Sequence, residues 1–423
     1  MSGYARAASA LGASVSGSDG ARSAYTERLE QDGILTAQIG HRAENVPGGE
    51  DVVLYYSTAV GEGNVERAAA RERGIPELPR AELLAELSAL RRTIAVAGTH
   101  GKTTTSSMLV HAMRGAGMDP GWLIGGSIGG ELPNSSWTDG EWLVVEADES
   151  DRSMLRLTAE VAVLTNVELE HHATYGSLAE LREAFAELLA GARQAVIWNR
   201  PELLALRGVD GVPYDAEDVT LTAGGSRFLW RGHAVRLAVP GVHNAVDAAG
   251  ALEAARLAGA DEAAAAASLS SFTGAGRRFQ RLGLSERGGA VYEDYAHHPT
   301  EIAATLRGAR TLQHDRLVAV FQPHLFSRTA LLAREFGESL ALADEVFVLE
   351  VYPARERSED FPGISGLRIA EAAADAAAGR PVYWLPSFEQ MLPVLRRHLR
   401  EGDVCVVMGA GDVQELAEDL VAR

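Results

Sequence analysis

Short apolar runs alternate along the chain with longer segments in which apolar residues recur at helical spacing. Several of these runs are rich in Val, Ile and Leu and have no polar residue over four or five positions. Such runs are typical of strands that helices cover on both faces, as in α/β domains built on parallel sheets. We expect strands at residues 13–18, 51–57, 93–97, 142–146, 161–166, 290–294, 317–322, 346–351, 382–385 and 404–408.

The same pattern predicts three domains. Residues 1–90 form the first, which ends in a connecting helix rich in Ala, Glu and Leu. Residues 91–284 form the second, in which a β-rich stretch over 205–240 precedes an Ala-rich helix that starts near His243. Residues 285–423 form the third and return to the alternation of strand and helix. A chain of 423 residues is long enough for each domain to have its own core.

Composition and charge narrow the functional class. The formal net charge of −19 argues against broad binding of nucleic acid, which usually requires a basic face. No run of about 18 apolar residues and no N-terminal signal segment appears, so we expect neither membrane association nor secretion. The single Cys405 cannot form an internal disulfide and fits a reducing compartment. We therefore expect a cytoplasmic protein.

The segment 93–105 has the form of a phosphate-binding loop. A short apolar strand leads through Gly98 and Gly101 into Lys102 and then into three threonines that open a helix. Glycines let backbone N–H groups approach phosphate oxygens, the helix N-terminus adds partial positive charge, and a threonine hydroxyl can bind Mg²⁺. Lys102 is the only lysine of the chain. Because the strict P-loop has Gly where this chain has Val96, a generic P-loop ATPase or kinase is disfavoured.

Acidic and histidine residues follow the next two predicted strands. Glu146 ends the strand 142–146, where a Mg²⁺ ligand facing the phosphate loop is needed. The strand 161–166 is followed by residues that can supply oxygen and nitrogen ligands to a second divalent ion, namely Glu168, Glu170 and His171. His172 adjoins them, but adjacent side chains at a strand end diverge, so we expect it to have another role.

Weaker signals follow in the remaining sequence. Asn244 lies at the start of a predicted helix, and its side-chain amide can form hydrogen bonds with an edge of adenine. Arg277 and Arg278 follow small residues and suit a clamp on the γ-phosphate. The third domain places polar residues beyond two predicted strand ends, namely Asp294, His297 and Arg328. Two strands that end in such loops indicate an active surface.

Together these segments resemble the Mur ligase family over essentially the whole chain. Eight motifs match in order: GTHGKTTT at 98–105, EADESD at 146–151, TNVELEHHATY at 165–175, GVHN at 241–244, TGAGRRF at 273–279, EDYAHHPTE at 293–301, FQPH…R at 321–328 and GAGDV at 409–413. The resemblance implies α/β architecture in three domains. These are a Rossmann-like N-terminal domain for the UDP-sugar, a central P-loop-like ATPase domain with a parallel sheet, and a C-terminal Rossmann-like domain.

The resemblance also implies ATP-dependent ligation of L-alanine to the carboxylate of UDP-N-acetylmuramate through an acyl phosphate, in peptidoglycan precursor synthesis. ATP and Mg²⁺ are the implied cofactors, and a monomer or weak homodimer is the implied state. The implied phosphate contacts are Gly98, Thr99, His100, Gly101, Lys102, Thr103 and Thr104. The implied metal ligands are Thr103 and Glu146 for one Mg²⁺ and His171 for another. The implied remaining contacts are Asn244 with adenine, Arg277 or Arg278 with a phosphate, Asp294 with the ribose, and His297 and Arg328 with alanine and the acyl phosphate.

Two alternatives stay open. The murein tripeptide recycling ligase shares the Thr-His-Gly-Lys loop, although its second motif usually has an aromatic residue where this chain has Ser150. The second alternative is a truncated nucleotide-binding protein without ligase activity.

The chain departs from the family pattern at its start. Family members begin with a strand and a turn of the form GIGGxGMSG, and this chain opens at the MSG that ends this motif, so we expect codons upstream of Met1 to encode the rest. The family usually has Asp at Glu170, Asn at Asp247 and Arg at Leu325.

Overall fold

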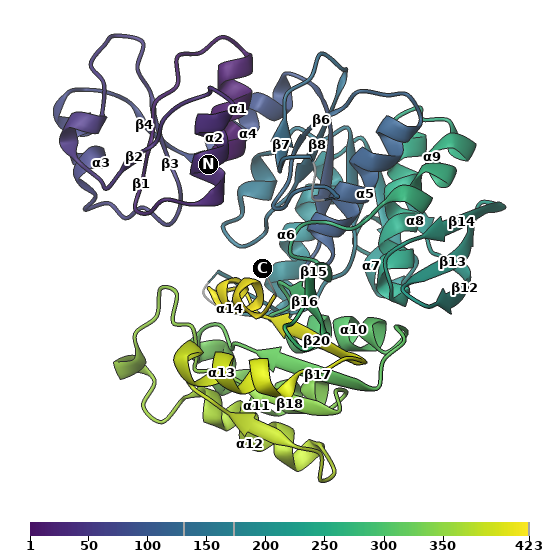
Figure 1. Cartoon of the computed structure of the whole chain (residues 1–423). Helices are drawn as coiled ribbons and strands as arrows, with labels where there is room; N and C mark the ends of the chain where they lie inside the picture. Colours follow the sequence, from purple (N-terminus) through teal and green to yellow (C-terminus); the bar gives the residue numbers. More distant parts are fainter. Residues whose placement is uncertain (130–131, 172–173, 422–423) are drawn as a thin grey trace. The chain divides into compact units, whose positions relative to one another are not determined.

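The computed structural model describes residues 1–129, 132–171 and 174–421, so His172 lies outside the described residues. The chain forms two compact units. The first comprises Met1–Asp215 and Val246–Ser268, and the second comprises Ala216–Ala245 and Leu269–Arg423. Each unit is built from strands and helices in alternation, which confirms the predicted α/β class (Figure 1).

The N-terminal part of the first unit has only short strands. Its elements are α1 (Ser2–Ala10), β1 (Ser18–Asp19), α2 (Ala24–Gln31), β2 (Gln38–Ile39), β3 (Leu54–Tyr56), α3 (Val65–Glu72), β4 (Glu77–Pro79) and α4 (Arg80–Ala89). β1 pairs with β2 and β3 pairs with β4, both in parallel. The strand expected at 13–18 is wrong over residues 13–17, because the paired segment begins only at Ser18.

A seven-stranded sheet dominates the rest of the first unit. The elements of this part are β5 (Arg92–Ala97), α5 (Lys102–Gly115), β6 (Gly121–Leu123), β7 (Ser135–Ser136), β8 (Trp142–Glu146), β9 (Val161–Leu164), α6 (Leu178–Gly191), β10 (Gln194–Trp198), α7 (Pro201–Leu204), β11 (Gly211–Tyr214), α8 (Val242–Leu257) and α9 (Glu262–Ser268). The start of α8, up to Ala245, is assigned to the second unit. The strand order is β11-β10-β9-β5-β8-β6-β7, and only β7 is antiparallel to its neighbour. The chain runs from β5 to one side and later returns to the other, so the direction of the strand order switches at β5.

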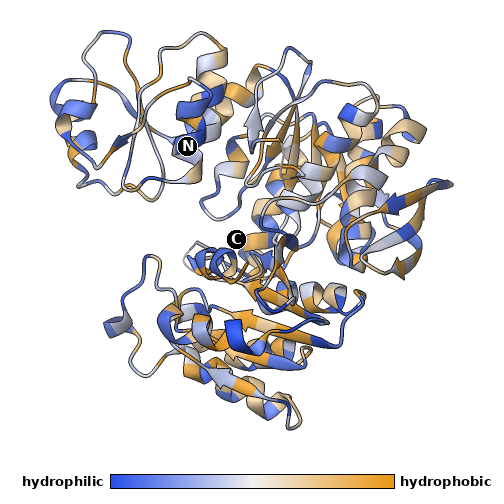
Figure 2. Cartoon of the chain, in the orientation of Figure 1, coloured by the Kyte–Doolittle hydropathy of each residue, from blue (hydrophilic) through white to orange (hydrophobic). Residues whose placement is uncertain are grey.

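The core of this sheet explains why its strands are continuously apolar. Alternate residues of β5 and β9, such as Ala95 and Leu164, pack with Phe185 and Leu189 of α6 in one buried cluster. Ile94 and Val96 belong to the other face, and they are fully buried as well. Figure 2 shows the central strands in hydrophobic colours. A strand buried on both faces needs no polar alternation, as the sequence pattern predicted.

The second unit contains a small antiparallel sheet and a larger mixed one. The small sheet consists of β12 (Glu217–Thr222), β13 (Gly225–Trp230) and β14 (His233–Leu237). The larger one has the order β15-β16-β20-β17-β18-β19, in which only β15 is antiparallel. Its elements are β15 (Gln280–Leu284), β16 (Ala290–Asp294), α10 (Pro299–Ala309), β17 (Arg316–Phe321), α11 (Phe326–Leu340), β18 (Glu345–Val348), α12 (Gly366–Ala376), β19 (Val382–Trp384), α13 (Phe388–His398), β20 (Asp403–Met408) and α14 (Val413–Leu420).

Helices cover both faces of this six-stranded sheet. Phe321 of β17 belongs to the cluster that includes Phe336 of α11 and Ile369 of α12. Val320, the preceding residue, belongs to the cluster on the opposite face with Leu416 of α14. Successive side chains of a strand point to opposite faces, so one strand serves two cores. The sheet is therefore the middle of three layers, and its strand ends are the places left for polar residues.

Candidate active site

The loop between β5 and α5 is held in a conformation that requires glycine at two positions. Gly98 has φ +135° and Gly101, the residue before α5, has φ +83°. A Cβ on Gly98 would lie 2.0 Å from the Thr165 hydroxyl, and one on Gly101 would lie 2.8 Å from Asp247 Oδ1. These glycines therefore allow both the left-handed turn and the close approach of neighbouring segments. The loop leads into the N-terminus of α5 at the point where the strand order switches.

The residues that follow β9 fix this loop from one side. The Thr99 hydroxyl donates to the backbone O of Glu168 at 3.0 Å and accepts from its N–H at 2.9 Å. Asn166 Oδ1 accepts from the His100 N–H at 2.9 Å, and Asn166 Nδ2 donates to His100 O at 2.9 Å. The Thr165 hydroxyl donates to the same oxygen at 2.6 Å. Asn166 and Thr165 thus have loop-fixing roles that the sequence alone did not assign.

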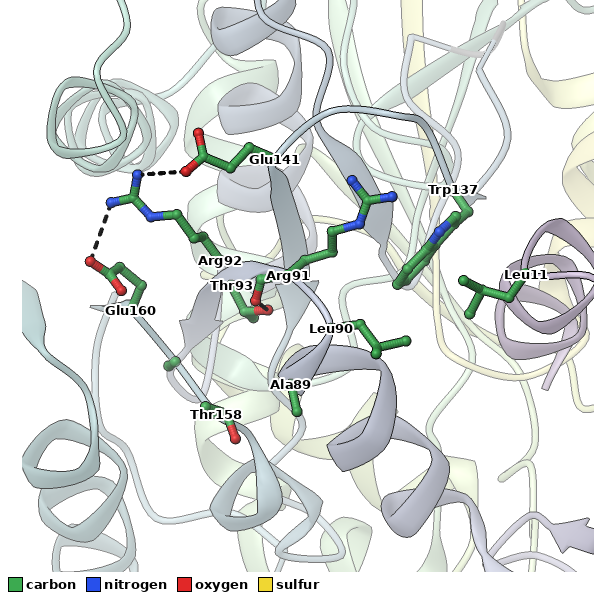
Figure 3. A pocket seen from close by; sticks show the side chains of 11 residues that line it. Leu11, Ala89, Leu90, Arg91, Arg92, Thr93, Trp137, Glu141, Thr158 and Glu160 are labelled. Atoms are coloured by element: carbon green, nitrogen blue, oxygen red, sulfur yellow. Dashed lines mark hydrogen bonds and ion pairs between the residues drawn. The ribbon is translucent and has the colours of Figure 1, made fainter.

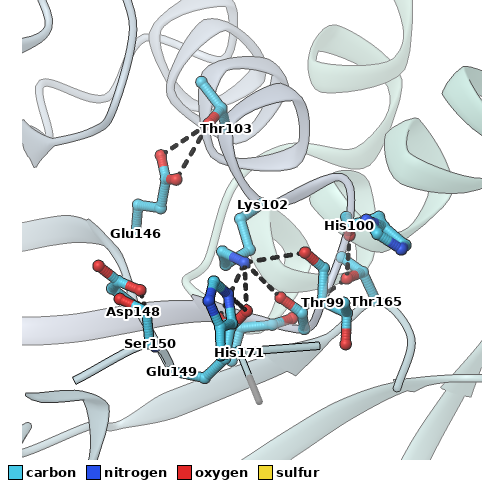
Figure 4. A network of polar contacts seen from close by, with 12 residues as sticks. Thr99, His100, Lys102, Thr103, Glu146, Asp148, Glu149, Ser150, Thr165 and His171 are labelled. Atoms are coloured by element: carbon cyan, nitrogen blue, oxygen red, sulfur yellow. Dashed lines mark hydrogen bonds and ion pairs between the residues drawn. The ribbon is translucent and has the colours of Figure 1, made fainter. Parts of the chain in front are cut away.

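Lys102 lies at the centre of the loop, as Figure 4 shows. Its ammonium donates to the backbone oxygens of Gly98 at 2.6 Å and Thr99 at 3.0 Å. It also forms an ion pair with Glu149, with Nζ 2.8 Å from Oε2. Burial alone would lower the pKa of Lys102, but the charges of Glu149, Asp148 and Glu146 together outweigh burial and raise the pKa above its ordinary value. The side chain is therefore a fixed positive charge.

Thr103 and Glu146 form a second contact beside the lysine. The Thr103 hydroxyl lies 3.0 Å from each carboxylate oxygen of Glu146, at the carboxyl end of β8. Glu146 Oε2 also accepts a hydrogen bond from the Gly125 N–H at 2.7 Å. A hydroxyl and a carboxylate are hard oxygen donors of the kind that Mg²⁺ prefers. The structure brings together these two predicted ligands of one metal.

His171 contacts a carboxylate that the sequence reasoning did not single out. Its Nε2 lies 3.1 Å from Oε1 of Glu149, the same residue that pairs with Lys102. Glu149 is fully buried, at 0% exposure, three residues beyond the end of β8. The EADESD motif contained it, and its place after a strand end next to the phosphate loop was the available signal.

The same segment carries an ion-pair cluster with the first helical turn of α4. Arg80 donates to Asp148 at 2.8 Å and to Asp151 at 2.7 Å. Burial opposes ionisation of Asp148, but the charge of Lys102, hydrogen bonds from Ser150 and the contact with Arg80 lower its pKa to about 2. The segment after β8 is therefore held by two ion-pair contacts, one with Arg80 of α4 and one with Lys102 of α5.

In the second unit, Asp294 at the end of β16 is buried and accepts hydrogen bonds from its own loop, from the segment before β15 and from α10. Its oxygens accept from the backbone N–H groups of Ala296 at 2.7 Å and Phe279 at 2.9 Å, and from the Thr305 hydroxyl at 3.1 Å. Burial raises the pKa of Asp294 to about 6, although the nearby charge of Arg278 works in the opposite direction. These contacts make Asp294 a residue that shapes the loop.

The two predicted arginine clamps also have partners nearby. Arg277 Nε donates to Glu293 at 2.6 Å, and its terminal nitrogen donates to Gly409 O at 3.3 Å. Arg278 lies 3.9 Å from Glu301 and covers the ring of Tyr295. Both guanidinium groups are thus placed beside acidic side chains of the same unit.

Three further predicted residues lie at loop or helix starts of the second unit. His297 Nδ1 lies 2.9 Å from Tyr295 O, and its ring makes an edge contact with His324, 6.1 Å between centroids. Arg328 lies on α11, with Nη1 3.3 Å from His324 Nδ1. His324 therefore joins His297 and Arg328 at the ends of β16 and β17. The Asn244 amide donates to Pro240 O at 2.6 Å.

A hollow of about 800 Å³ lies at the opposite ends of β5 and β8 (Figure 3). Three of its charged groups are paired with one another, because Arg92 contacts Glu141 at 3.0 Å and Glu160 at 3.2 Å. Arg91 donates to the backbone oxygen of Thr138. In open parallel sheets ligands bind at the carboxyl ends of strands, whereas this hollow lies at the amino ends. We therefore assign the candidate site to the loop around Lys102.

Comparison with known proteins agrees with this geometry. Three family models match successive segments: the Mur ligase family catalytic domain over residues 1–92, the Mur ligase middle domain over 96–255, and the Mur ligase glutamate ligase domain over 277–411.

None of the helices in the described part of the chain combines the length and apolar character that a membrane crossing requires.

Individual relatives match over nearly the whole chain. The UDP-N-acetylmuramate–L-alanine ligase of Rubrobacter xylanophilus is 41% identical over 441 residues, which covers 100% of this chain and 97% of the relative. The UDP-N-acetylmuramate–L-alanine ligase of Chlorobaculum parvum is 40% identical, and the match covers 96% of this chain and 90% of the relative. The crystal structure of UDP-N-acetylmuramate-alanine ligase MurC from Thermotoga maritima has a TM-score of 0.85 at 26% identity and covers 99% of this chain and 95% of that one. A murein peptide ligase from Psychrobacter arcticus gives 0.70 at the same identity and coverage. The chain belongs to the Mur ligase family.

Proposed function

We propose that this protein joins L-alanine to the carboxylate of UDP-N-acetylmuramate at the expense of ATP. As a Mur ligase family member it is an ATP-dependent ligase that forms an amide bond. The observation that carries the proposal is the Lys102 site at the switch point of the seven-stranded sheet. It occurs in a chain about 40% identical over its whole length to ligases named for that reaction.

The residues of the first unit would bind the triphosphate of ATP. The loop of Gly98, Thr99, His100, Gly101 and Thr104 would surround the phosphates. The N–H groups of Thr99 and His100 are bonded to Asn166, so we propose that the N–H groups at the N-terminus of α5 contact the phosphate oxygens. Lys102 adds a positive charge whose position is fixed by three hydrogen-bond acceptors. An ammonium so held is pre-organised for charge that develops during phosphoryl transfer, which is the main source of rate in such reactions.

Mg²⁺ belongs to the proposal, and the residues present fit it. Thr103 and Glu146, whose oxygen atoms contact each other, would hold one Mg²⁺, and His171, whose Nε2 is bonded to Glu149, would bind a second. The two cations would neutralise charge on the transferring phosphoryl group.

We also propose substrate contacts for residues of the second unit. We assign Asn244 to adenine, Asp294 to the ribose, and Arg277 or Arg278 to a phosphate. We assign His297 and Arg328 to the alanine and the acyl phosphate, and His324 supports both because it contacts each of them.

The chemistry proceeds in two steps. The muramate carboxylate attacks the γ-phosphorus of ATP, which gives an acyl phosphate and ADP. The amine of alanine then attacks the acyl carbon, and the C–O bond to phosphate breaks as the tetrahedral intermediate collapses. No covalent bond to the protein is needed, so positioning and charge neutralisation by the site residues supply the rate.

The experiment that tests the proposal measures phosphate release with ATP, Mg²⁺ and UDP-N-acetylmuramate, with and without L-alanine. We expect release to require both substrates. The recycling reaction, in which a tripeptide replaces alanine, is tested in the same assay with L-alanyl-γ-D-glutamyl-diaminopimelate as the amine. Turnover with the tripeptide and none with alanine would overturn the proposal, and turnover with neither would favour a nucleotide-binding protein without ligase activity.

Location and assembly are also part of the proposal. We propose a cytoplasmic enzyme, since the free Cys405 is buried and fits a reducing compartment. We propose a monomer or weak homodimer that binds neither nucleic acid nor membrane, in keeping with the net charge of −19.

A further inference from the structure

Glu149 is the only carboxylate in the described part of the chain that contacts both Lys102 and His171. Its Oε1 lies 3.0 Å from the Lys102 ammonium and 3.1 Å from His171 Nε2, and its Oε2 lies 2.8 Å from the same ammonium. The side chain has no exposure to solvent. A buried carboxylate is costly unless it is paired, so its two partners explain why it is tolerated here.

The backbone around Glu149 is tied to the segment that carries His171. The Tyr175 hydroxyl donates to Glu149 O at 2.8 Å, and the Thr174 hydroxyl donates to Ser150 O at 2.6 Å. Tyr175 is itself fully buried. These bonds connect the loop after β8 to the loop after β9 within a few residues of both side chains. The distance between Glu149 and His171 is therefore fixed by backbone contacts as well as by their own hydrogen bond.

The contact also determines how the imidazole of His171 is used. A carboxylate only accepts hydrogen bonds, so the ring nitrogen facing it must carry the proton. In the neutral ring, a proton on Nε2 leaves the lone pair on Nδ1. Histidine ligands of metals commonly donate their other N–H to a carboxylate or carbonyl, which fixes the tautomer and the ring orientation.

We propose that Glu149 is a positioning residue that holds the Lys102 ammonium and fixes the tautomer of His171, so that Nδ1 is free to bind a divalent cation beside the phosphates. The cation's role in catalysis rests on the proposed function. The tautomer and the lysine contact do not, because both are properties of the protein alone. The buried side chain of Glu149 thus positions both the Lys102 ammonium and the His171 imidazole, which come from different loops.

Two substitutions separate the two contacts. Glu149→Gln keeps an oxygen that can accept from His171 Nε2–H but removes the negative charge next to Lys102. Glu149→Met keeps the approximate size and removes both contacts. Asp151→Asn is the matched control, because Asp151 lies in the same segment but contacts Arg80. Thermal unfolding of each variant shows whether it is folded.

The chain offers an unusually direct readout, because Lys102 is its only lysine. Nitrogen-labelled lysine therefore gives one side-chain NMR signal in the whole protein. The His171 ring is identified among the twelve histidines as the signal that disappears in His171→Gln. We expect the wild-type His171 ring to carry its proton on Nε2. Glu149→Gln should keep this tautomer and shift the lysine signal, Glu149→Met should change both, and Asp151→Asn should change neither.

Metal binding provides the second measurement. Titration of Mn²⁺ in the presence of ADP, followed by electron paramagnetic resonance, should show affinity reduced about tenfold to a hundredfold in Glu149→Met, the range for lost support of a metal ligand. Asp151→Asn should bind Mn²⁺ as the wild type does.

A wild-type His171 ring protonated on Nδ1 would overturn the inference, as would unchanged Mn²⁺ affinity in a folded Glu149→Met. If Glu149→Met does not fold, the wild-type tautomer and the lysine shift in Glu149→Gln still decide. Failure of the proposed function has a different signature, namely the absence of alanine-dependent phosphate release by the wild-type protein.

Discussion

The seven-stranded sheet and the six-stranded sheet place polar residues at the same structural position but use them differently. At the carboxyl edge of the first, charged side chains from three loops contact one another, as Lys102, Glu149 and His171 do. At the carboxyl edge of the second, Asp294 accepts hydrogen bonds from the backbone N–H groups of Ala296 and Phe279, and His297 contacts a backbone oxygen. Both edges follow the rule that polar groups collect where parallel strands end.

The difference teaches that position at a strand end does not by itself assign a role. Lys102 keeps 14% of its side chain exposed and is held by a carboxylate and two carbonyls, so it is a charge aimed at an edge of the sheet. Asp294 is 6% exposed and builds the turn that starts α10. Partners and burial therefore distinguish a side chain held by a charged group from another loop from one held mainly by backbone N–H groups. The following predictions test this distinction, from the largest expected effect to the smallest.

Lys102→Ala should have the largest effect. It removes the ammonium that we propose neutralises phosphate charge, so we expect alanine-dependent phosphate release to fall by about a thousandfold, as for loss of a pre-organised transition-state contact. It also leaves Glu149 without its cation, which should destabilise the first unit by about 3–5 kcal/mol. Steady-state kinetics and thermal unfolding measure the two effects. Activity equal to that of the wild type would remove the basis of the proposed function.

Gly98→Ala should come next. Its Cβ would lie 2.0 Å from the Thr165 hydroxyl, and its φ of +135° strains any residue with a side chain. Strain and overpacking together should cost about 4 kcal/mol, measured by denaturant unfolding. Gly117→Ala is the matched control, because Gly117 has φ +80° with no atom near its added Cβ. It should cost only about 1 kcal/mol from the backbone alone. Equal losses for the two variants would mean that contact with Thr165 does not constrain the loop.

The sequence predicted the strands that form the middle of each sheet. The expected bounds of β8 and β16 match the structure, those of β5 and β20 differ by one residue at one end, and those of β17 differ by one residue at both ends. These strands are buried on both faces, so a continuous apolar run identifies them. The strands β2, β4, β6, β7, β10 and β15 were missed. β6 and β7 have only three and two residues, too few for a period to be visible.

Part of the candidate site was also predictable from short stretches of sequence. Lys102, Thr103 and Glu146 belong to local patterns, a glycine turn before a helix and an acidic strand end, which carry their chemistry in a few consecutive residues. Glu149 and Asn166 were not predicted, because their roles depend on partners from distant segments. Asp247, where the family usually has Asn, lies against Gly101, a proximity that only the tertiary fold reveals.

Asp294→Asn should change the pH dependence of stability. Burial raises the pKa of Asp294 to about 6, against an ordinary value of 3.8, so the folded chain holds this proton more tightly than the unfolded chain. The wild-type stability from this group is therefore present below about pH 4 and falls as the pH rises to about 6, by no more than about 3 kcal/mol. Unfolding free energies at several pH values should show this fall in the wild type and its absence in the variant. Parallel curves for the two proteins would contradict the raised pKa.

Arg92→Ala should have the smallest effect, although Arg92 has two ion pairs just as Lys102 has several contacts. Arg92 lies at the amino end of β5, its side chain is 42% exposed, and its partner Glu141 is 66% exposed. Solvent screens such pairs, so we expect a loss of no more than about 1 kcal/mol in unfolding free energy, and an unchanged rate of alanine-dependent phosphate release. A large loss of activity in Arg92→Ala would show that the amino edge of the sheet, and the hollow there, contribute to the reaction. Both residues are cations in contact with carboxylates. An unchanged rate in Arg92→Ala would therefore mean that the larger effect of Lys102→Ala comes from the burial of Lys102 and from its position beyond the carboxyl end of β5.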